Sequence, residues 1–107
     1  MNPAFEDRQV AQKILQGMGG DEVWVFGSRA MGDNQEDSDL DLLVLVPDSN
    51  EPRHVRSRRA RGIVADVPRA MDVCVLTRQE WERQVNIVNT LPFLARNEGR
   101  ILAKRHG

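Results

Sequence analysis

Aromatic residues are scarce in this chain, which has two tryptophans, three phenylalanines and no tyrosine in 107 residues. Proteins that hold single-stranded nucleic acid stack successive bases on aromatic side chains. The composition therefore argues against a nucleic-acid-binding module, even though lysine and arginine together number 15.

Long apolar runs and paired cysteines are also missing. No apolar stretch approaches the ~20 residues that a membrane-spanning helix needs. Residues 1–8 lack the basic and then apolar pattern of a secretory signal. Cys74 is the only cysteine, and it lies in the apolar segment 71–76. We therefore expect a buried, reduced thiol in a cytoplasmic protein without membrane contact.

The formal net charge of −1 hides a segregation of charge along the chain. Residues 21–50 hold eight acidic residues and a single arginine. A basic run follows, made of Arg53, Arg56, Arg58, Arg59 and Arg61. The simplest interpretation of this run is a solvated helix face. The alternative is a contact for a partner protein, for RNA or for the tail of a triphosphate.

Local patterns predict a single domain over residues 1–107, a length that suits one core. Helices are expected from Pro3 to the pair Gly19–Gly20, over 51–64, and after the capping box that Thr77 and Glu80 form. Trp81, Val85 and Val88 would share one face of that third helix. A shorter helix would begin near residue 90 and end at Gly99, and one or two helical turns are expected in 27–32.

Apolar runs predict strands over 22–26, 39–46 and 71–76, with 100–103 as either a last short strand or a tail. The expected order is α-β-α-β-α-β-α. The connection between the second and third strands is long enough for a right-handed parallel crossover. The predicted class is thus α/β (α+β), a small mixed sheet with helices packed on it.

Two acidic residues open the second predicted strand. Because side chains alternate along a strand, Asp39 and Asp41 would project to one side and the apolar even-numbered residues of 40–46 to the other. An isolated pair of this kind is ordinarily just solvated, but aspartate is disfavoured in so apolar a strand. Asp72, near the start of the third strand, would join them if the two strands are neighbours. Three carboxylates suit one or two Mg²⁺ ions.

Gly27 and Ser28 follow the first predicted strand. Glycine lets the backbone approach a ligand closely, and amides at the start of a short helix point at an anion. The Ser28 hydroxyl could donate to a phosphate oxygen, and Arg29 could neutralise one. The plainer alternatives are an ordinary turn and a surface arginine. The chain has no Gly-x-x-x-x-Gly-Lys-Ser/Thr sequence, so this is not a P-loop.

Taken together, segments 27–32 and 38–44 (GSRAMG and SDLDLLV) resemble the signature of the DNA polymerase beta-like nucleotidyltransferase superfamily. More narrowly, the chain is similar to the minimal nucleotidyltransferases of bacteria and archaea, over roughly residues 10–103. Asp72 matches the family's third acid. Met31 departs from the pattern, which commonly has arginine there and so a further phosphate contact.

The resemblance implies roles for these residues. Gly27 and Ser28 would hold the triphosphate, and Asp39 and Asp41 would bind the catalytic and the nucleotide-bound metal ions. Asp72 would bind the catalytic metal and help activate the acceptor hydroxyl. The implied reaction transfers a nucleoside monophosphate, AMP from ATP or its equivalent from another triphosphate, and releases pyrophosphate with two Mg²⁺ ions as cofactors.

The resemblance leaves the acceptor open. The family's minimal members are often antitoxins that adenylylate a HEPN-domain toxin at tyrosine, and a domain this small would need an acceptor brought by a partner or by a second copy in a homo-oligomer. One alternative is a small-molecule transferase of the aminoglycoside-modifying type. Another is a non-catalytic antitoxin that neutralises its partner by contact or binds a nucleotide without transferring it.

Overall fold

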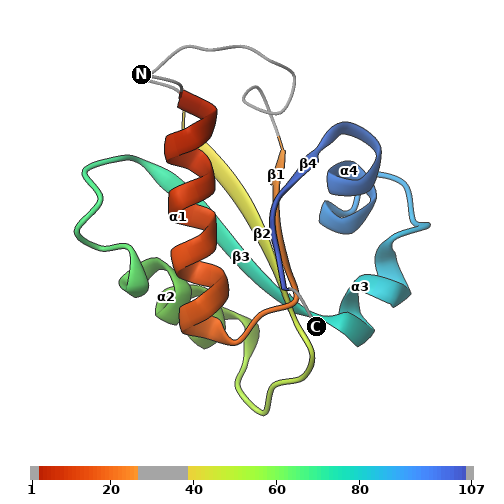
Figure 1. The fold of residues 1–107 in the computed structure, drawn as a ribbon. Helices are drawn as coiled ribbons and strands as arrows, with labels where there is room; N and C mark the ends of the chain where they lie inside the picture. Colours follow the sequence, from red (N-terminus) through yellow and green to blue (C-terminus); the bar gives the residue numbers. More distant parts are fainter. Residues whose placement is uncertain (1–2, 27–38, 106–107) are drawn as a thin grey trace.

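The computed structural model describes residues 3–26 and 39–105, with side chains from Asp7 onward in the first of these ranges. The described elements alternate helices with the strands of one sheet (Figure 1). In chain order they are α1 (Pro3–Met18), β1 (Glu22–Phe26), β2 (Leu40–Val46), α2 (Arg53–Ile63), β3 (Met71–Thr77), α3 (Arg78–Gln84), α4 (Leu91–Glu98) and β4 (Arg100–Lys104).

The four strands form one mixed sheet in the order β3-β2-β1-β4. β1 runs antiparallel to both β2 and β4, whereas β2 and β3 are parallel. The parallel pair is in register from Leu40 opposite Met71 to Val46 opposite Thr77. α2 lies in the crossover between these two strands. The mixed sheet and the parallel crossover are therefore confirmed.

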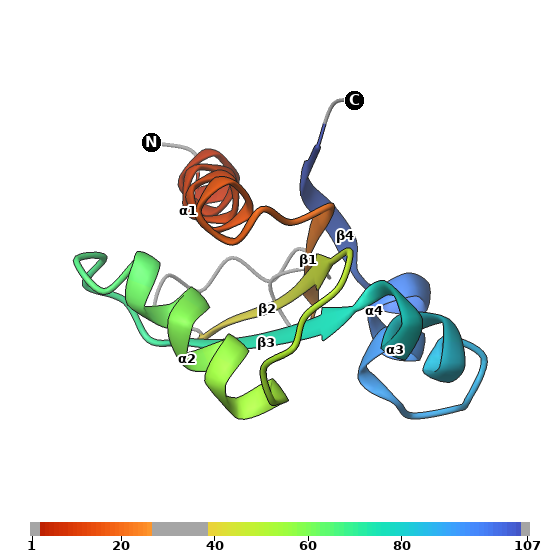
Figure 2. The ribbon, with the colours of Figure 1, turned by 90° about the horizontal axis from the view of Figure 1, so that it is seen from below.

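Helices pack on both faces of the sheet and form a separate core on each face. α1 and α2 share one core with the even-numbered residues of β2, which are Leu40, Leu42, Val44 and Val46. Leu43 and Leu45 point to the opposite face and pack with Trp81 and Ala95 from α3 and α4. Figure 2 shows α1 on one side of the sheet and α3 and α4 beyond its other side. β2 is thus apolar on both faces except at Asp41.

The signals that start and stop the helices act as expected. α1 ends at Gly19, whose φ of 61° is left-handed, and the Gly20 N–H donates to the Leu15 carbonyl at 2.9 Å. Thr77 and Glu80 form the complete capping box that begins α3. Local chemistry therefore decides these helix boundaries.

The expected extent of the third helix was wrong. α3 ends at Gln84, and Val88 is 66% exposed in the segment before α4 instead of sharing a face with Trp81. Asn89 adopts a φ of 69°, and the Thr90 hydroxyl donates to the Gln84 carbonyl at 2.7 Å. Asparagine and threonine side chains that bond to the local backbone compete with helix continuation.

At the C-terminal end, residues 100–104 form a strand and not a tail, because β4 pairs with β1. The expected element order lacked this strand. The helical turns expected in 27–32 fall outside the described residues.

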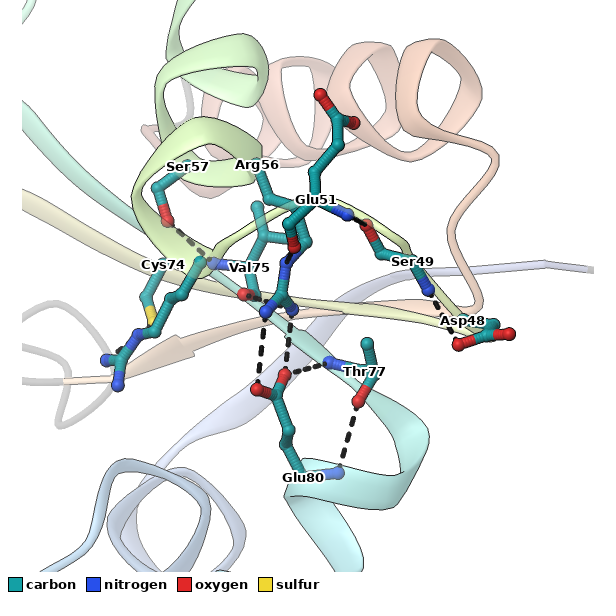
Figure 3. A network of polar contacts seen from close by, with 10 residues as sticks. Asp48, Ser49, Glu51, Arg56, Ser57, Cys74, Val75, Thr77 and Glu80 are labelled. Atoms are coloured by element: carbon teal, nitrogen blue, oxygen red, sulfur yellow. Dashed lines mark hydrogen bonds and ion pairs between the residues drawn. The ribbon is translucent and has the colours of Figure 1, made fainter.

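The basic run of α2 is only partly solvated. Arg56 is 5% exposed, and its Nη1 donates to the Val75 carbonyl at 3.1 Å and to Glu80 at 2.7 Å (Figure 3). Its Nε donates to the Glu51 carbonyl at 3.0 Å. The Ser57 hydroxyl accepts from the Val75 N–H at 3.2 Å. The expectation of a solvated face is wrong for Arg56, which joins α2 to α3 and closes the outer edge of β3.

Candidate active site

The predicted acids meet at the end of the sheet where β2 and β3 both begin. Asp41 and Asp72 are directly opposite each other in the parallel register. Partners in register on adjacent strands project to the same face, so the two carboxylates are neighbours. Asp39 immediately precedes the first residue of β2. The register thus brings together acids that lie 31 residues apart in the chain.

The three carboxylates interact electrostatically. Burial raises the pKa of Asp41 above its ordinary value, and the negative charges of Asp72 and then Asp39 raise it further. Asp41 is half-buried because β2 is an inner strand, whereas Asp72 is exposed on the edge strand β3. Like charges gathered in partly desolvated surroundings favour the neutral acid, unless a cation balances them.

The other neighbour of Asp41 is Phe26, the last residue of β1. The last residue of β1 therefore lies beside Asp41, and Gly27 is the next residue in the sequence. Gly27, Ser28 and Arg29, the predicted triphosphate-binding residues, lie outside the described residues. Sequence reasoning did not single out Phe26, although the register of an antiparallel β1–β2 pair would have placed it beside Asp41.

The donor set of Asp39, Asp41 and Asp72 consists of carboxylate oxygens, which are the ligands that Mg²⁺ prefers. Over 3–26 and 39–105 no group of three or more His, Cys, Asp or Glu side chains is already arranged to hold a metal ion. The raised pKa of Asp41 nevertheless shows repulsion among the carboxylates, which a bound cation would reduce. The chemistry of the donors therefore fits Mg²⁺.

Cys74 lies on the same face of β3 as Asp72, two residues further along. The thiol is half-buried, so the expected full burial is too strong, and burial raises its pKa. The Arg53 Nη2 donates to the Cys74 Sγ at 3.0 Å. This contact places a guanidinium from the start of α2 beside the strand that carries Asp72.

Residues 8–98 match the sequence profile of the nucleotidyltransferase domain family. The match covers most of the chain, which therefore belongs to this family and to its class of enzyme, the nucleotidyltransferases. The resemblance inferred from the Gly-Ser and Asp-x-Asp segments is confirmed at the level of the family.

Solved structures share the fold. One is a candidate nucleotidyltransferase from Sulfolobus solfataricus, 23% identical, with a TM-score of 0.57 over 98% of this chain and 90% of that one. Another is a toxin–antitoxin structure with AMP-PNP, 17% identical, with a TM-score of 0.55 over 92% of this chain and 74% of that one. At these identities the likeness concerns the fold alone. No curated protein sequence matches the chain.

Every helix among residues 3–26 and 39–105 is too short or too polar to span a bilayer.

Proposed function

We propose that this protein is a Mg²⁺-dependent nucleotidyltransferase that moves AMP from ATP to a hydroxyl group on a partner protein. The observation that carries the proposal is the parallel register of β2 and β3, which sets Asp41 opposite Asp72 with Asp39 directly before β2. The raised pKa of Asp41 agrees with this gathering of carboxylates. Three interacting carboxylates at one end of a sheet suit a divalent cation with oxygen ligands. The family supplies the class of reaction.

Asp39, Asp41 and Asp72 would hold the metal. Their side chains would have to turn towards a common point, since the described residues contain no ready-made cluster. Two bound Mg²⁺ ions would neutralise charge on the phosphate oxygens and on the departing pyrophosphate. Gly27 and Ser28 would hold the triphosphate, and Arg29 would pair with a phosphate oxygen.

The transfer step is an in-line displacement. The acceptor hydroxyl oxygen forms a bond to the α-phosphorus of ATP, while the bond from that phosphorus to the bridging oxygen of the β-phosphate breaks. Pyrophosphate leaves with the electron pair. Asp72 would accept the hydroxyl proton. Its exposure on the edge strand β3, which an acceptor could approach, supports this role.

Two lines of support point to a protein acceptor. A structure with the same fold is a toxin–antitoxin bound to AMP-PNP, an ATP analogue. The resemblance to minimal nucleotidyltransferases adds a HEPN-domain toxin as the partner and an antitoxin role in the cytoplasm. The acceptor would then be brought to Asp72 by that partner, or by a second copy of this chain.

Transfer of label from ATP tests the proposal. The chain is incubated with Mg²⁺, ATP labelled at the α-phosphate and a HEPN-domain protein. We expect label on the partner and release of pyrophosphate. Asp39→Asn, Asp41→Asn and Asp72→Asn should each lower the rate at least about 100-fold, as expected for removal of a group that stabilises transition-state charge. Asp48→Asn is the matched control, because Asp48 is exposed beyond the opposite end of β2.

The remaining outcomes separate the alternatives. Label transfer that survives all three substitutions refutes the metal assignment. Neutralisation of the toxin without label or nucleotide turnover indicates a non-catalytic antitoxin. In a parallel incubation that also contains an aminoglycoside, label on that compound but not on protein indicates a small-molecule transferase.

A further inference from the structure

The arginines of α2 differ in how their charge is used. Arg56 and Arg59 form ion pairs with Glu80 and Glu51, and Arg61 donates to two backbone carbonyls. Arg53 and Arg58, in contrast, have no ion pair with any described residue. Two of the five positive charges are therefore not balanced by an ion pair with any other described residue.

Arg53 has most of its hydrogen-bonding capacity free. A guanidinium carries five N–H donors. Within the described chain, the Arg53 side chain makes a single hydrogen bond, from Nη2 to the Cys74 Sγ at 3.0 Å. A thiol is a weak acceptor. The exposed Arg53 thus keeps a fork of donors that matches a carboxylate in shape and charge.

The contact with Cys74 fixes where this fork lies. Cys74 and Asp72 are on the same face of β3 and two residues apart, a spacing of about 7 Å along the strand. β3 lies on one side of β2, whereas β1, which leads to Gly27 and Ser28, lies on the other. Arg53 therefore stands on the β3 side of the sheet, near Asp72, and not on the side of β1.

We propose that Arg53 determines acceptor specificity by binding a carboxylate of the partner protein, about two residues from the residue that carries the acceptor hydroxyl. This inference rests on the proposed function, because it takes Asp72 as the point where that hydroxyl binds. In an extended acceptor, side chains two residues apart share a face and are separated by about 7 Å. That spacing matches the one between Asp72 and Cys74.

The positive charge of Arg53 favours an acidic protein segment as its binding partner. Arg58 lies five residues further along the same helix, about 140° around its axis from Arg53, so it adds to the positive charge of α2 without lying beside Arg53. Once bound metal ions neutralise Asp39, Asp41 and Asp72, a polycationic small molecule such as an aminoglycoside would be repelled by Arg53. The scarcity of aromatic residues argues against a nucleic acid.

Three synthetic peptides test the inference. Each contains tyrosine, serine and threonine, and they differ only in having Glu, Gln or Lys two residues before and after each hydroxyl-bearing residue. We expect KM to be about tenfold lower for the Glu peptide than for the Gln peptide, as for one charge-assisted hydrogen bond. Arg53→Gln should abolish this preference with kcat unchanged. Arg58→Gln, the same loss of an exposed, unpaired charge on the same helix, should retain it.

Binding provides a readout that does not depend on turnover. Fluorescence anisotropy of the labelled Glu peptide is measured with Asp41→Asn and with Asp41→Asn/Arg53→Gln. The second variant should bind about tenfold more weakly. If no acceptor of any kind is labelled, the proposed function fails, and anisotropy alone then decides whether Arg53 binds acidic segments.

Two outcomes overturn the inference while leaving the transferase intact. One is equal KM or equal binding for the Glu and Lys peptides. The other is an Arg53-dependent contact with an RNA oligonucleotide and none with the peptides.

Discussion

Asp41→Asn should stabilise the folded protein while removing its activity. In the folded state, burial and the charges of Asp72 and Asp39 raise the pKa of Asp41 above its ordinary 3.8. A carboxyl whose pKa is raised by folding binds protons more tightly in the folded state. Its ionised form therefore destabilises the fold, and stability falls as pH rises through the folded pKa. Asparagine has nearly the same shape without the charge.

The size of the gain follows from the surroundings of Asp41. The side chain is only half-buried, so water screens much of the repulsion. Interactions between partly exposed charges are on the order of 0.5 kcal/mol each. Removal of two repulsions and a partial desolvation cost should therefore give about 1 kcal/mol. For a domain of about 100 residues this raises Tm by roughly 4–8 °C.

Thermal unfolding measures the effect. At pH 7 without divalent ions, the Tm of Asp41→Asn should be higher than that of the wild type. The control Asp48→Asn should have the Tm of the wild type. The difference should shrink as the pH falls from 7 towards 4, because protonation progressively neutralises Asp41, whose pKa is raised. Mg²⁺ should then raise the Tm of the wild type by mass action and leave Asp41→Asn nearly unchanged. A variant that melts below the wild type at pH 7, or a gap that widens in acid, would refute the reasoning.

Two further predictions concern the frame around the site. Arg56 and Thr77 lower the pKa of Glu80 from 4.5 to about 2, so its ionised form stabilises the fold above pH 4.5 and loses this effect as pH falls towards 2. The Glu80 side chain is 31% exposed, so solvent screens part of its ion pair. Glu80→Gln should therefore lower the free energy of unfolding by about 1 kcal/mol at pH 7. Denaturation curves at pH 3 should show a smaller loss. Gly99→Ala should lower Tm, because its Cβ would lie 2.5 Å from the Ala95 carbonyl oxygen and 2.6 Å from that of Val25; an unchanged Tm would show that both backbones can give way.

The sequence was sufficient where local chemistry decides the structure. The Thr77–Glu80 capping box and the left-handed Gly19 depend on neighbours within a few residues, so their patterns predicted the helix ends. The meeting of Asp41 and Asp72 also followed, since each acid opens an apolar strand and the crossover between those strands has the length of a parallel connection.

Contacts between distant residues could not be predicted in this way. Arg56 and Arg58 look alike within the basic run, yet Arg56 is buried because Glu80, 24 residues later, meets it across the sheet edge. Val88 continues the spacing of Trp81 and Val85, but the Thr90 hydroxyl ends the helix first. In the first case a partner 24 residues away decides the burial of Arg56, and in the second a hydrogen bond across six residues competes with the helical spacing.

The position of the carboxylates follows from where the helices stop covering the sheet. On the face that carries Asp41, the residues at 43 and 45 are completely buried by the packing of α3 and α4, whereas Asp41 is half-buried. On β3, Leu76 is buried, Cys74 is half-buried and Asp72 is exposed. Burial thus decreases steadily towards the start of both strands. Among the described residues, the helices thus leave Asp41 and Asp72 open to water at that end, where their charges stay partly solvated.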